Sequence, residues 1–215
     1  MIQRIIQPEL LETLANEDPD AVLGRRDLRI VNLVMGNHRW ITRVLRRHYR
    51  PGWRITELGA GDGALSMHLC RSKLCRAEDL HAFDLVGRPA HWPPQAQWTQ
   101  GDLLEQPLPH SEVLVVNLLL HQFQDAQLRR LGSRIPPTTR LIVAAEPARS
   151  PAHAVLGRLL CAAARFHPIT RHDMQVSIRA GFRHDELAKA LALEPGWTTS
   201  SATTPFGAYH FVAFR

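Results

Sequence analysis

The stretch that decides the fold is Glu57-Leu58-Gly59-Ala60-Gly61-Asp62-Gly63. The residues before it, 53–58 (WRITEL), have the composition of a strand, and a helix is expected after it to about residue 74. Glycines are needed at such a turn because the chain bends sharply and a ligand can approach the backbone without interference from Cβ atoms. The free N–H groups of the following helix favour a phosphate or a carboxylate. The stretch therefore predicts a strand–loop–helix unit that binds a ligand.

Outward from this unit, the sequence alternates between strand and helix patterns. Strands are expected at 79–84, 96–100, 111–117 and 139–145, and helices at 8–17, 20–48 (broken at Gly36-Asn37), 124–134, 151–165 and 183–193. The 85–95 crossover contains three prolines, which leave little room for a regular helix. Strands that alternate with helical crossovers imply a parallel sheet covered on both faces.

The last two strand patterns, 197–204 and 208–215, are separated only by Pro205-Phe206-Gly207. So short a link permits a hairpin but no parallel crossover, so these strands should be antiparallel. The predicted fold is α/β, a Rossmann-like seven-stranded sheet with a reversed C-terminal strand and helices on both faces. Residues 1–50 are expected to form an N-terminal helical lid on a domain that spans 51–215, within one structural domain.

Polar residues end the predicted strands. Asp84 ends the second strand, Asp102 follows the third after Gly101, and Asn117 ends the fourth. The carboxyl ends of parallel strands lie at one edge of a sheet, where open α/β sheets bind their ligands. We therefore expect these side chains to surround the ligand of the glycine loop.

With these motifs, residues 53–215 resemble the class I S-adenosylmethionine-dependent methyltransferases. The resemblance implies that Glu57 orders the loop while Gly59, Ala60, Gly61 and Gly63 pass over the methionine part of the cofactor. It also implies that Asp84, with Leu85 beside it, holds the ribose hydroxyls. By the same resemblance Asp102 takes the adenine amino group beside the Leu103 backbone, and Asn117 lies near the methionine end.

Two further segments, 25–41 and 169–183, resemble uncharacterised bacterial methyltransferases suspected of acting on phenolic polyketides or quinones. A small-molecule acceptor is therefore expected, with a hydroxyl as the methylated group; carbon and nitrogen acceptors stay open. His121 is the first candidate base and His172 the second, although Thr170 and Asp173 can instead cap a helix that begins there. The remaining candidate residues for the substrate site or lid are Asn37, His38, Trp40, Asp173, Arg171 and Arg179.

Two alternatives to this reading rest on other features. Gly59, Gly61 and Ala64 also satisfy the dinucleotide fingerprint, which would indicate a nicotinamide- or flavin-dependent oxidoreductase. A net charge of +6 with an arginine cluster at Arg43, Arg46, Arg47 and Arg50 would suit an RNA-modifying methyltransferase. Glu57, Gly63 and the C-terminal hairpin favour the methyltransferase over the oxidoreductase. A solvated helix face accounts for the arginines, so we do not expect nucleic-acid binding.

Composition sets the remaining expectations. The chain has 215 residues, 45% of them hydrophobic, which is enough for one α/β domain with a sizeable core. It contains neither a secretory signal pattern nor an apolar run long enough to span a bilayer. Cys70, Cys75 and Cys161 form neither a metal set nor a disulfide framework, which favours a cytoplasmic location. No set of oxygen ligands suggests a metal.

Overall fold

The structure is a computed structural model that describes residues 3–15 and 18–215. The helix predicted over 8–17 includes residues 16 and 17, which lie outside the described ones. Within the described part, this prediction is wrong, because the segment forms only a short 3-10 turn, η1 (Leu10–Thr13), with extended residues on either side. Leu10 is exposed and Leu11 faces a cavity described below, so the apolar spacing reflects local contacts, not a helix face.

Seven strands form one sheet in the order β3-β2-β1-β4-β5-β7-β6. Their bounds are β1 (Ile55–Leu58), β2 (Leu80–Asp84), β3 (Gln97–Gln100), β4 (Val113–Asn117), β5 (Leu141–Pro147), β6 (Thr198–Thr203) and β7 (Ala208–Phe214). The first five strands run parallel, while β7 is antiparallel to both β5 and β6. The predicted sheet and its reversed terminal strand are confirmed.

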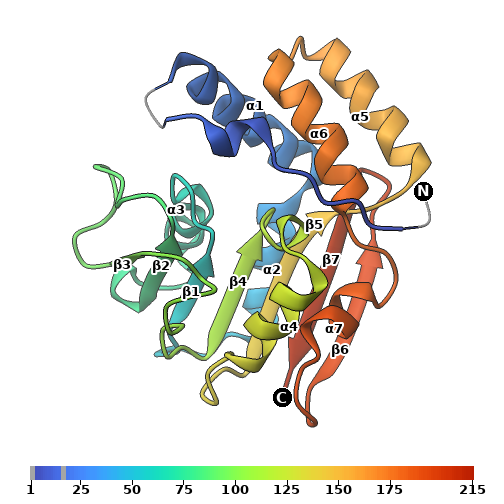
Figure 1. Cartoon of the computed structure of the whole chain (residues 1–215). Helices are drawn as coiled ribbons and strands as arrows, with labels where there is room; N and C mark the ends of the chain where they lie inside the picture. The colour runs from blue at the N-terminus through green and yellow to red at the C-terminus, as the bar shows by residue number, and fades with distance from the viewer. Residues whose placement is uncertain (1–2, 16–17) are drawn as a thin grey trace.

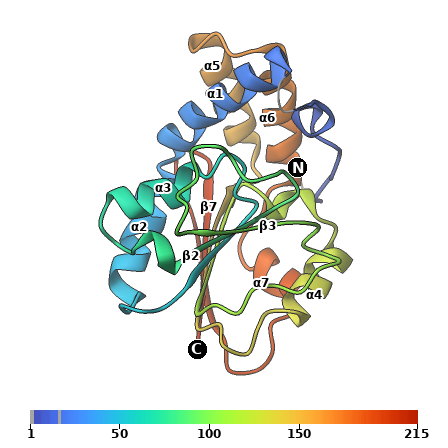
Figure 2. The same ribbon diagram turned by 90° about the vertical axis from the view of Figure 1, so that its left-hand side faces the viewer.

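Alternating side chains on each strand build two apolar layers. On β4, Val113 and Val115 belong to the cluster under α2 (Asn37–His48) and α3 (Ala64–Arg71), whereas Leu114 and Val116 belong to the cluster on the other face. That second face is covered by α4 (Asp125–Ser133) and α7 (Glu186–Leu191). Figure 2 shows these helix pairs on opposite sides of the sheet. The central strands are buried on both faces because helices cover both.

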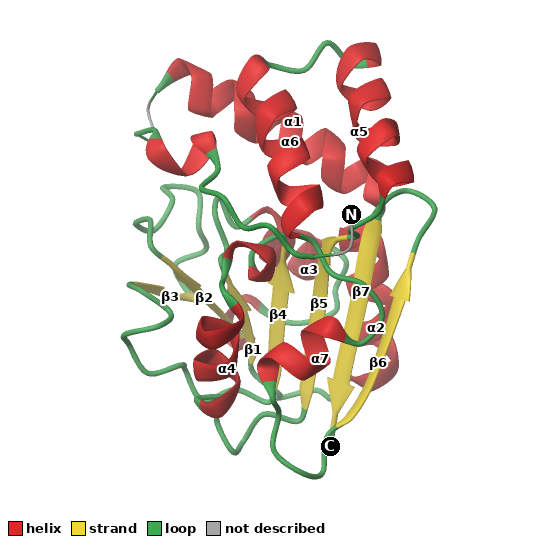
Figure 3. Ribbon diagram, turned by 45° about the vertical axis from the view of Figure 1, so that its right-hand side comes forward, coloured by secondary structure: helices red, strands yellow, loops and turns green. Residues whose placement is uncertain are grey.

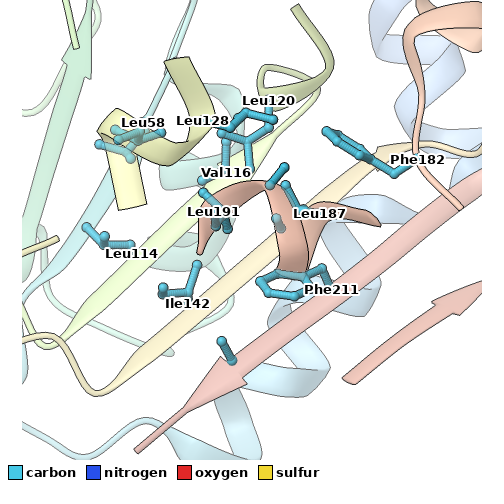
Figure 4. Packing of buried hydrophobic residues seen from close by; sticks show 14 of the residues in the cluster. Leu58, Leu114, Val116, Leu120, Leu128, Ile142, Phe182, Leu187, Leu191 and Phe211 are labelled. Atoms are coloured by element: carbon cyan, nitrogen blue, oxygen red, sulfur yellow. The ribbon is translucent and has the colours of Figure 1, made fainter. Parts of the chain in front are cut away.

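The packing under α7 illustrates how the layers fit together. Leu187 and Leu191 of α7 point toward Ile142 and Phe211 of the sheet (Figure 4), and all four side chains are at most 3% exposed. Removing a buried leucine side chain from such a core typically costs about 2–5 kcal/mol of folding free energy. This apolar layer fixes the strands whose ends carry the candidate site.

A cap of three helices stands above the carboxyl ends of the parallel strands (Figures 1 and 3). It consists of α1 (Pro19–Met35), α5 (Pro151–Ala163) and α6 (Pro168–Ala180), and α6 packs against both of the others. Gly36, in the left-handed conformation at φ +72°, separates α1 from α2 as predicted. The role of residues 1–50 as a lid stays a prediction; within them, α1 joins the cap, whereas α2 packs on the sheet.

The crossover between β2 and β3 contains no regular helix between residues 85 and 96, as its prolines predict. Trp92 is nevertheless 3% exposed, and its indole N–H donates to the carbonyl of Ala96 at 3.1 Å. Its ring lies so close to Gly63 that a Cβ at that position would come within 2.7 Å of it. The crossover thus replaces a helix with an aromatic contact to the glycine loop.

Candidate active site

The glycine loop joins β1 to α3 at the cap end of the sheet. Gly59, Gly61 and Gly63 adopt φ angles of +70°, +56° and +75°, a region that strongly favours glycine. A Cβ built on Gly61 would meet no atom within 4 Å, so open space adjoins the loop there. Ala60, between them, is buried. The loop therefore leaves room for a ligand over Gly61, whereas Leu119 and Trp92 pack against Gly59 and Gly63.

Glu57 stands at the base of the loop. Its carboxylate accepts hydrogen bonds from the backbone N–H of Ser66 at 3.1 Å and from the Ser66 hydroxyl, which ties the end of β1 to the first turn of α3. Burial raises the pKa of Glu57 to about 8, although the Ser66 hydrogen bonds oppose that rise. Glu57 thus links the two ends of the loop through Ser66.

Asp84 connects the second strand to the loop. One carboxylate oxygen accepts from the N–H of Gly61 at 2.7 Å and the other from the N–H of Val86 at 2.9 Å. Each oxygen keeps a further lone pair with which it can accept from a ligand hydroxyl. The adjacent Leu85 is 69% exposed, so its side chain is largely open to solvent.

Asp102 lies after β3, as its position in the sequence predicts. It is exposed, and its side chain accepts from the N–H of Leu104 at 2.7 Å. Leu103 is 6% exposed and packs into the cluster under α4. The two residues therefore present an exposed carboxylate beside a fixed backbone.

Asn117 belongs to a cluster of three asparagines at the end of β4. Its Oδ1 accepts from Asn37 at 2.9 Å, and its Nδ2 donates to Asn32 at 2.9 Å. Asn37 is fully buried, so it links the junction of α1 and α2 to the strand end and does not face the cavity. The sequence prediction named Asn37 for the substrate side but not for this contact.

A cavity of about 480 Å³ lies between the cap and the strand ends. Its wall is mainly apolar and comes mostly from α1, α5, α6, the loop after β4 and the loop between β6 and β7. Leu118, which directly follows Asn117, and His121 both line it. Its apolar wall includes Leu28, Val31, Met35, Leu156, Leu160, Ile169, Met174 and Phe206. Such a volume is typical of small-molecule sites.

His121 is the buried polar centre of this wall, at 3% exposure. Its Nδ1 lies 2.7 Å from Glu146 and its Nε2 lies 3.1 Å from Glu9. Burial alone would lower the pKa of His121, but the hydrogen bonds and charges of Glu146 and Glu9 outweigh burial and raise it to about 10. A histidine with the ordinary pKa of 6.5 would be mostly neutral at pH 7, whereas this arrangement keeps the His121 ring protonated.

Glu146 holds that histidine from the end of β5. It is fully buried, and it also accepts from the backbone N–H groups of Leu119 and Leu120 at 3.1 and 2.9 Å. The backbone of the β4 loop and the His121 ring are thus fixed by one carboxylate. The sequence analysis missed Glu146, although it follows the same rule of a polar residue at a strand end.

The second candidate base, His172, does not line the cavity. Its side chain is 51% exposed and its Nδ1 lies 3.0 Å from Asp173. Asp173 does line the cavity, but its carboxylate accepts from the N–H groups of Leu10 and Leu11. The expected cap at this point is wrong, because α6 already begins at Pro168.

The remaining candidates lie away from the cavity. Arg171 donates to the carbonyl of Phe166 at 2.9 Å, and Arg179 is exposed.

Trp40 stacks on His210 of β7, with ring centroids 3.9 Å apart, so it packs on the sheet. His38 faces His68, and burial lowers its pKa to about 4. The structure therefore gathers His121 and Asp173 at the cavity and leaves these four outside it.

Across residues 3–15 and 18–215, no group of three or more histidine, cysteine, aspartate or glutamate side chains is arranged to hold a metal ion. In the same part of the chain, every helix is too short or too polar to cross a membrane.

Comparison with known proteins identifies the fold. No protein-family profile matches the chain, and no curated protein matches its sequence. Among solved structures, the plantazolicin methyltransferase BpumL in complex with SAH (S-adenosylhomocysteine) matches with a TM-score of 0.67 at 12% identity, covering 93% of this chain and 91% of that one. This chain has the methyltransferase fold.

Two larger proteins share that methyltransferase fold. Human N-acetylserotonin methyltransferase in complex with SAM (S-adenosylmethionine) has a TM-score of 0.59 at 15% identity and is matched over 95% of this chain. The pyocyanin biosynthetic protein PhzM has a TM-score of 0.63 at 17% identity over 97% of this chain. The chain spans 61% and 62% of the lengths of these two proteins. The resemblance predicted from the glycine loop is thus confirmed for the fold.

Proposed function

We propose that this protein is a SAM-dependent methyltransferase that acts on a small, apolar molecule. The observation that carries the proposal is the position of the cavity. Leu118 and His121 line it, and Leu118 directly follows Asn117 at the end of β4. A molecule in the cavity therefore lies beside the strand end where the family resemblance puts the methionine end of the cofactor. Neighbours of the same fold bind SAM or SAH, which supports this choice of cofactor.

The residues at the strand ends fit such a cofactor. The open space at Gly61 leaves room for a ligand over the loop, and Asp84 keeps lone pairs for hydroxyl groups. Asp102 and Asn117 complete the set of polar side chains at successive strand ends. When bound, SAM would supply an electrophilic methyl group carried on sulfur. The chain's main task is then to align the acceptor with that methyl group.

The wall of the cavity indicates the class of acceptor. No lysine or arginine is found among the described residues that line it, so the wall offers no guanidinium or ammonium group to an anionic substrate. The apolar side chains of α1, α5 and α6 suit a flat, uncharged body. We therefore propose a phenolic or quinone-like metabolite, methylated on a hydroxyl oxygen, as in secondary metabolism.

His121 is the proposed general base, since it lines the cavity and His172 does not. Glu146 fixes the ring through Nδ1, which directs Nε2 toward the cavity side where Glu9 lies. The acceptor's hydroxyl proton would pass to Nε2 of His121 as the acceptor oxygen is methylated. A positioned base typically contributes about 10²–10⁴-fold to the rate.

Labelled SAM and a panel of phenols, quinones, amines and RNA test the proposal directly. We expect label transfer to phenols, and the His121→Ala variant should lower turnover by about 10²-fold or more while cofactor affinity stays within about threefold. His172→Ala is the matched control and should retain nearly full turnover. Transfer to RNA alone, or full turnover by His121→Ala, would contradict the proposal.

We also propose a cytoplasmic location. The cysteines Cys70, Cys75 and Cys161 are all free thiols, and free thiols persist in reducing compartments.

A further inference from the structure

An N-terminal arm, residues 3–14, crosses the cap and closes one side of the cavity. Figure 1 shows it in dark blue, running in front of α6 toward η1. Arg4 anchors one end of the arm by donating to the carbonyls of Phe123 and Ala180, each at 2.9 Å, and its guanidinium lies over the Phe182 ring. At the other end, Leu10 and Leu11 donate their N–H groups to Asp173 at 2.8 and 2.9 Å.

Between these anchors, the arm places Glu9 on the catalytic side of His121. The carboxylate of Glu9 lies 3.1 Å from Nε2 and also accepts from the hydroxyl of Ser177 on α6. Glu9 lines the same cavity as His121. Its oxygen thus stands where a substrate hydroxyl must stand to give its proton to Nε2.

The charged groups around His121 come from the arm, which includes η1, and from β5 and α6. Glu146 of β5 and Glu9 of the arm contact the two ring nitrogens, while the guanidinium of Arg4 donates to the His121 carbonyl at 3.2 Å. Glu12 of η1 and Asp173 of α6 also line the cavity. The hydrogen bond and charge of His121 lower the pKa of Glu9 despite its burial. With Glu9 in place, the imidazole therefore holds both protons and cannot act as a base.

We propose that Glu9 controls the base: it occupies Nε2 of His121 while the cavity is empty, and the acceptor's hydroxyl takes its place on binding. This inference rests on the proposed function. As the carboxylate of Glu9 withdraws, it takes the Nε2 proton and releases it to solvent, which leaves the His121 ring neutral. Nε2 then receives the hydroxyl proton of the acceptor. The protons balance because one leaves His121 before one arrives. Anchors that are formed by hydrogen bonds let the arm move without breaking the core.

The test is the titration of His121 in the free protein, followed by NMR of ¹⁵N-histidine and assigned with His121→Gln. In the wild type, the ring should stay protonated well above pH 8. Glu9→Gln removes one of the two carboxylates, so the apparent pKa should fall by about one unit or more. Glu12→Gln is the matched control, since it removes a carboxylate of the same arm that has no hydrogen bond to His121; its shift should be smaller. An unchanged titration in Glu9→Gln would overturn the proposal.

Kinetic measurements then show whether Glu9 only blocks Nε2 of His121, as a gate would, or is required for the reaction. With a phenol that accepts label, Glu9→Gln should raise kcat/KM at pH 7 by about tenfold for each unit by which the pKa of free His121 falls. The value of kcat should change less, because Glu9 has already left His121 in the substrate complex. A tenfold loss of kcat/KM would instead show that Glu9 takes part in the chemistry and would overturn its role as a gate.

Two features of these experiments allow each outcome to be interpreted. The titration of His121 needs no substrate. Its result therefore remains valid even when no acceptor in the panel is methylated and the proposed function fails. If Glu9→Gln does not fold, Glu9→Asp serves instead, because its side chain is one methylene shorter and reaches Nε2 less well. The titration of His121 should move in the same direction in that variant, and no movement would contradict the proposal.

Discussion

Polar residues at strand ends form the candidate site because parallel strands bring their carboxyl ends to one edge of the sheet. This rule located Asp84, Asp102 and Asn117 from the sequence. It also applies to Glu146, which was missed because the predicted strand stopped at Ala145, whereas β5 continues to Pro147. Glu9 carries no such signal. It meets His121 across 112 residues of sequence, and nothing local to either residue specifies that contact.

The charged state of His121 makes folding stability depend on pH. The pKa of the folded group, about 10, lies above its ordinary value of 6.5, so its contribution is fully present below pH 6.5 and is lost as pH rises toward 10. We expect the free energy of unfolding, measured by urea titration, to fall across this window by up to about 1.4 kcal/mol per pH unit from this group. His121→Gln should show a shallower fall above pH 8. Identical slopes in the two proteins would show that His121 is not held as an imidazolium.

At the scale of elements, helices and strands with a strong local pattern were predicted well, and those set by distant contacts were not. The α6 helix begins at Pro168, ahead of both Thr170 and Asp173, and the buried Asp27 of α1 accepts from the N–H of His167 and the hydroxyl of Thr170 at that end. The contact joins residues 140 positions apart, so a local reading of Thr170 and Asp173 as caps could not find it.

The hydrogen bonds from the arm to α6 give a test of how firmly the arm is held. Asp173→Ala leaves the N–H groups of Leu10 and Leu11 without their acceptor, so we expect a loss of about 1–3 kcal/mol in the free energy of unfolding. Hydrogen exchange at these two amides should become faster. His172→Ala, at the exposed neighbouring position, is the control and should change stability by less than about 0.5 kcal/mol. Equal losses of unfolding free energy in both variants would show that the Asp173 hydrogen bonds do not hold the arm.

For the molecule as a whole, the sheet follows from local period-two patterns, whereas the cap is assembled from two distant segments. The expected lid was confined to residues 1–50, but α5 and α6 form most of the cavity wall with α1. The sequence alone does not show which apolar side chains pack between distant segments and which pack locally. The size and apolar character of the cavity could therefore be learned only from the structure.

The distribution of charge is also a property of the whole molecule. Arg43, Arg46 and Arg47 are exposed on α2, away from the cavity, which fits a solvated helix face. We expect no retention on immobilised RNA at physiological salt. Retention that weakens steeply with added salt, and that disappears when the three arginines become alanine, would instead indicate nucleic-acid binding.

Calorimetric titration of the purified protein with SAM measures whether the glycine loop binds the cofactor. Gly61→Val should abolish binding, because the side chain would enter the open space over the loop. Gly52→Val is the matched control, since Gly52 also has a positive φ (+87°) and open surroundings but lies before β1, outside the loop. We expect micromolar binding of SAM by the wild type and by Gly52→Val, none by Gly61→Val, and no heat with NADH. Binding of NADH without binding of SAM would contradict it.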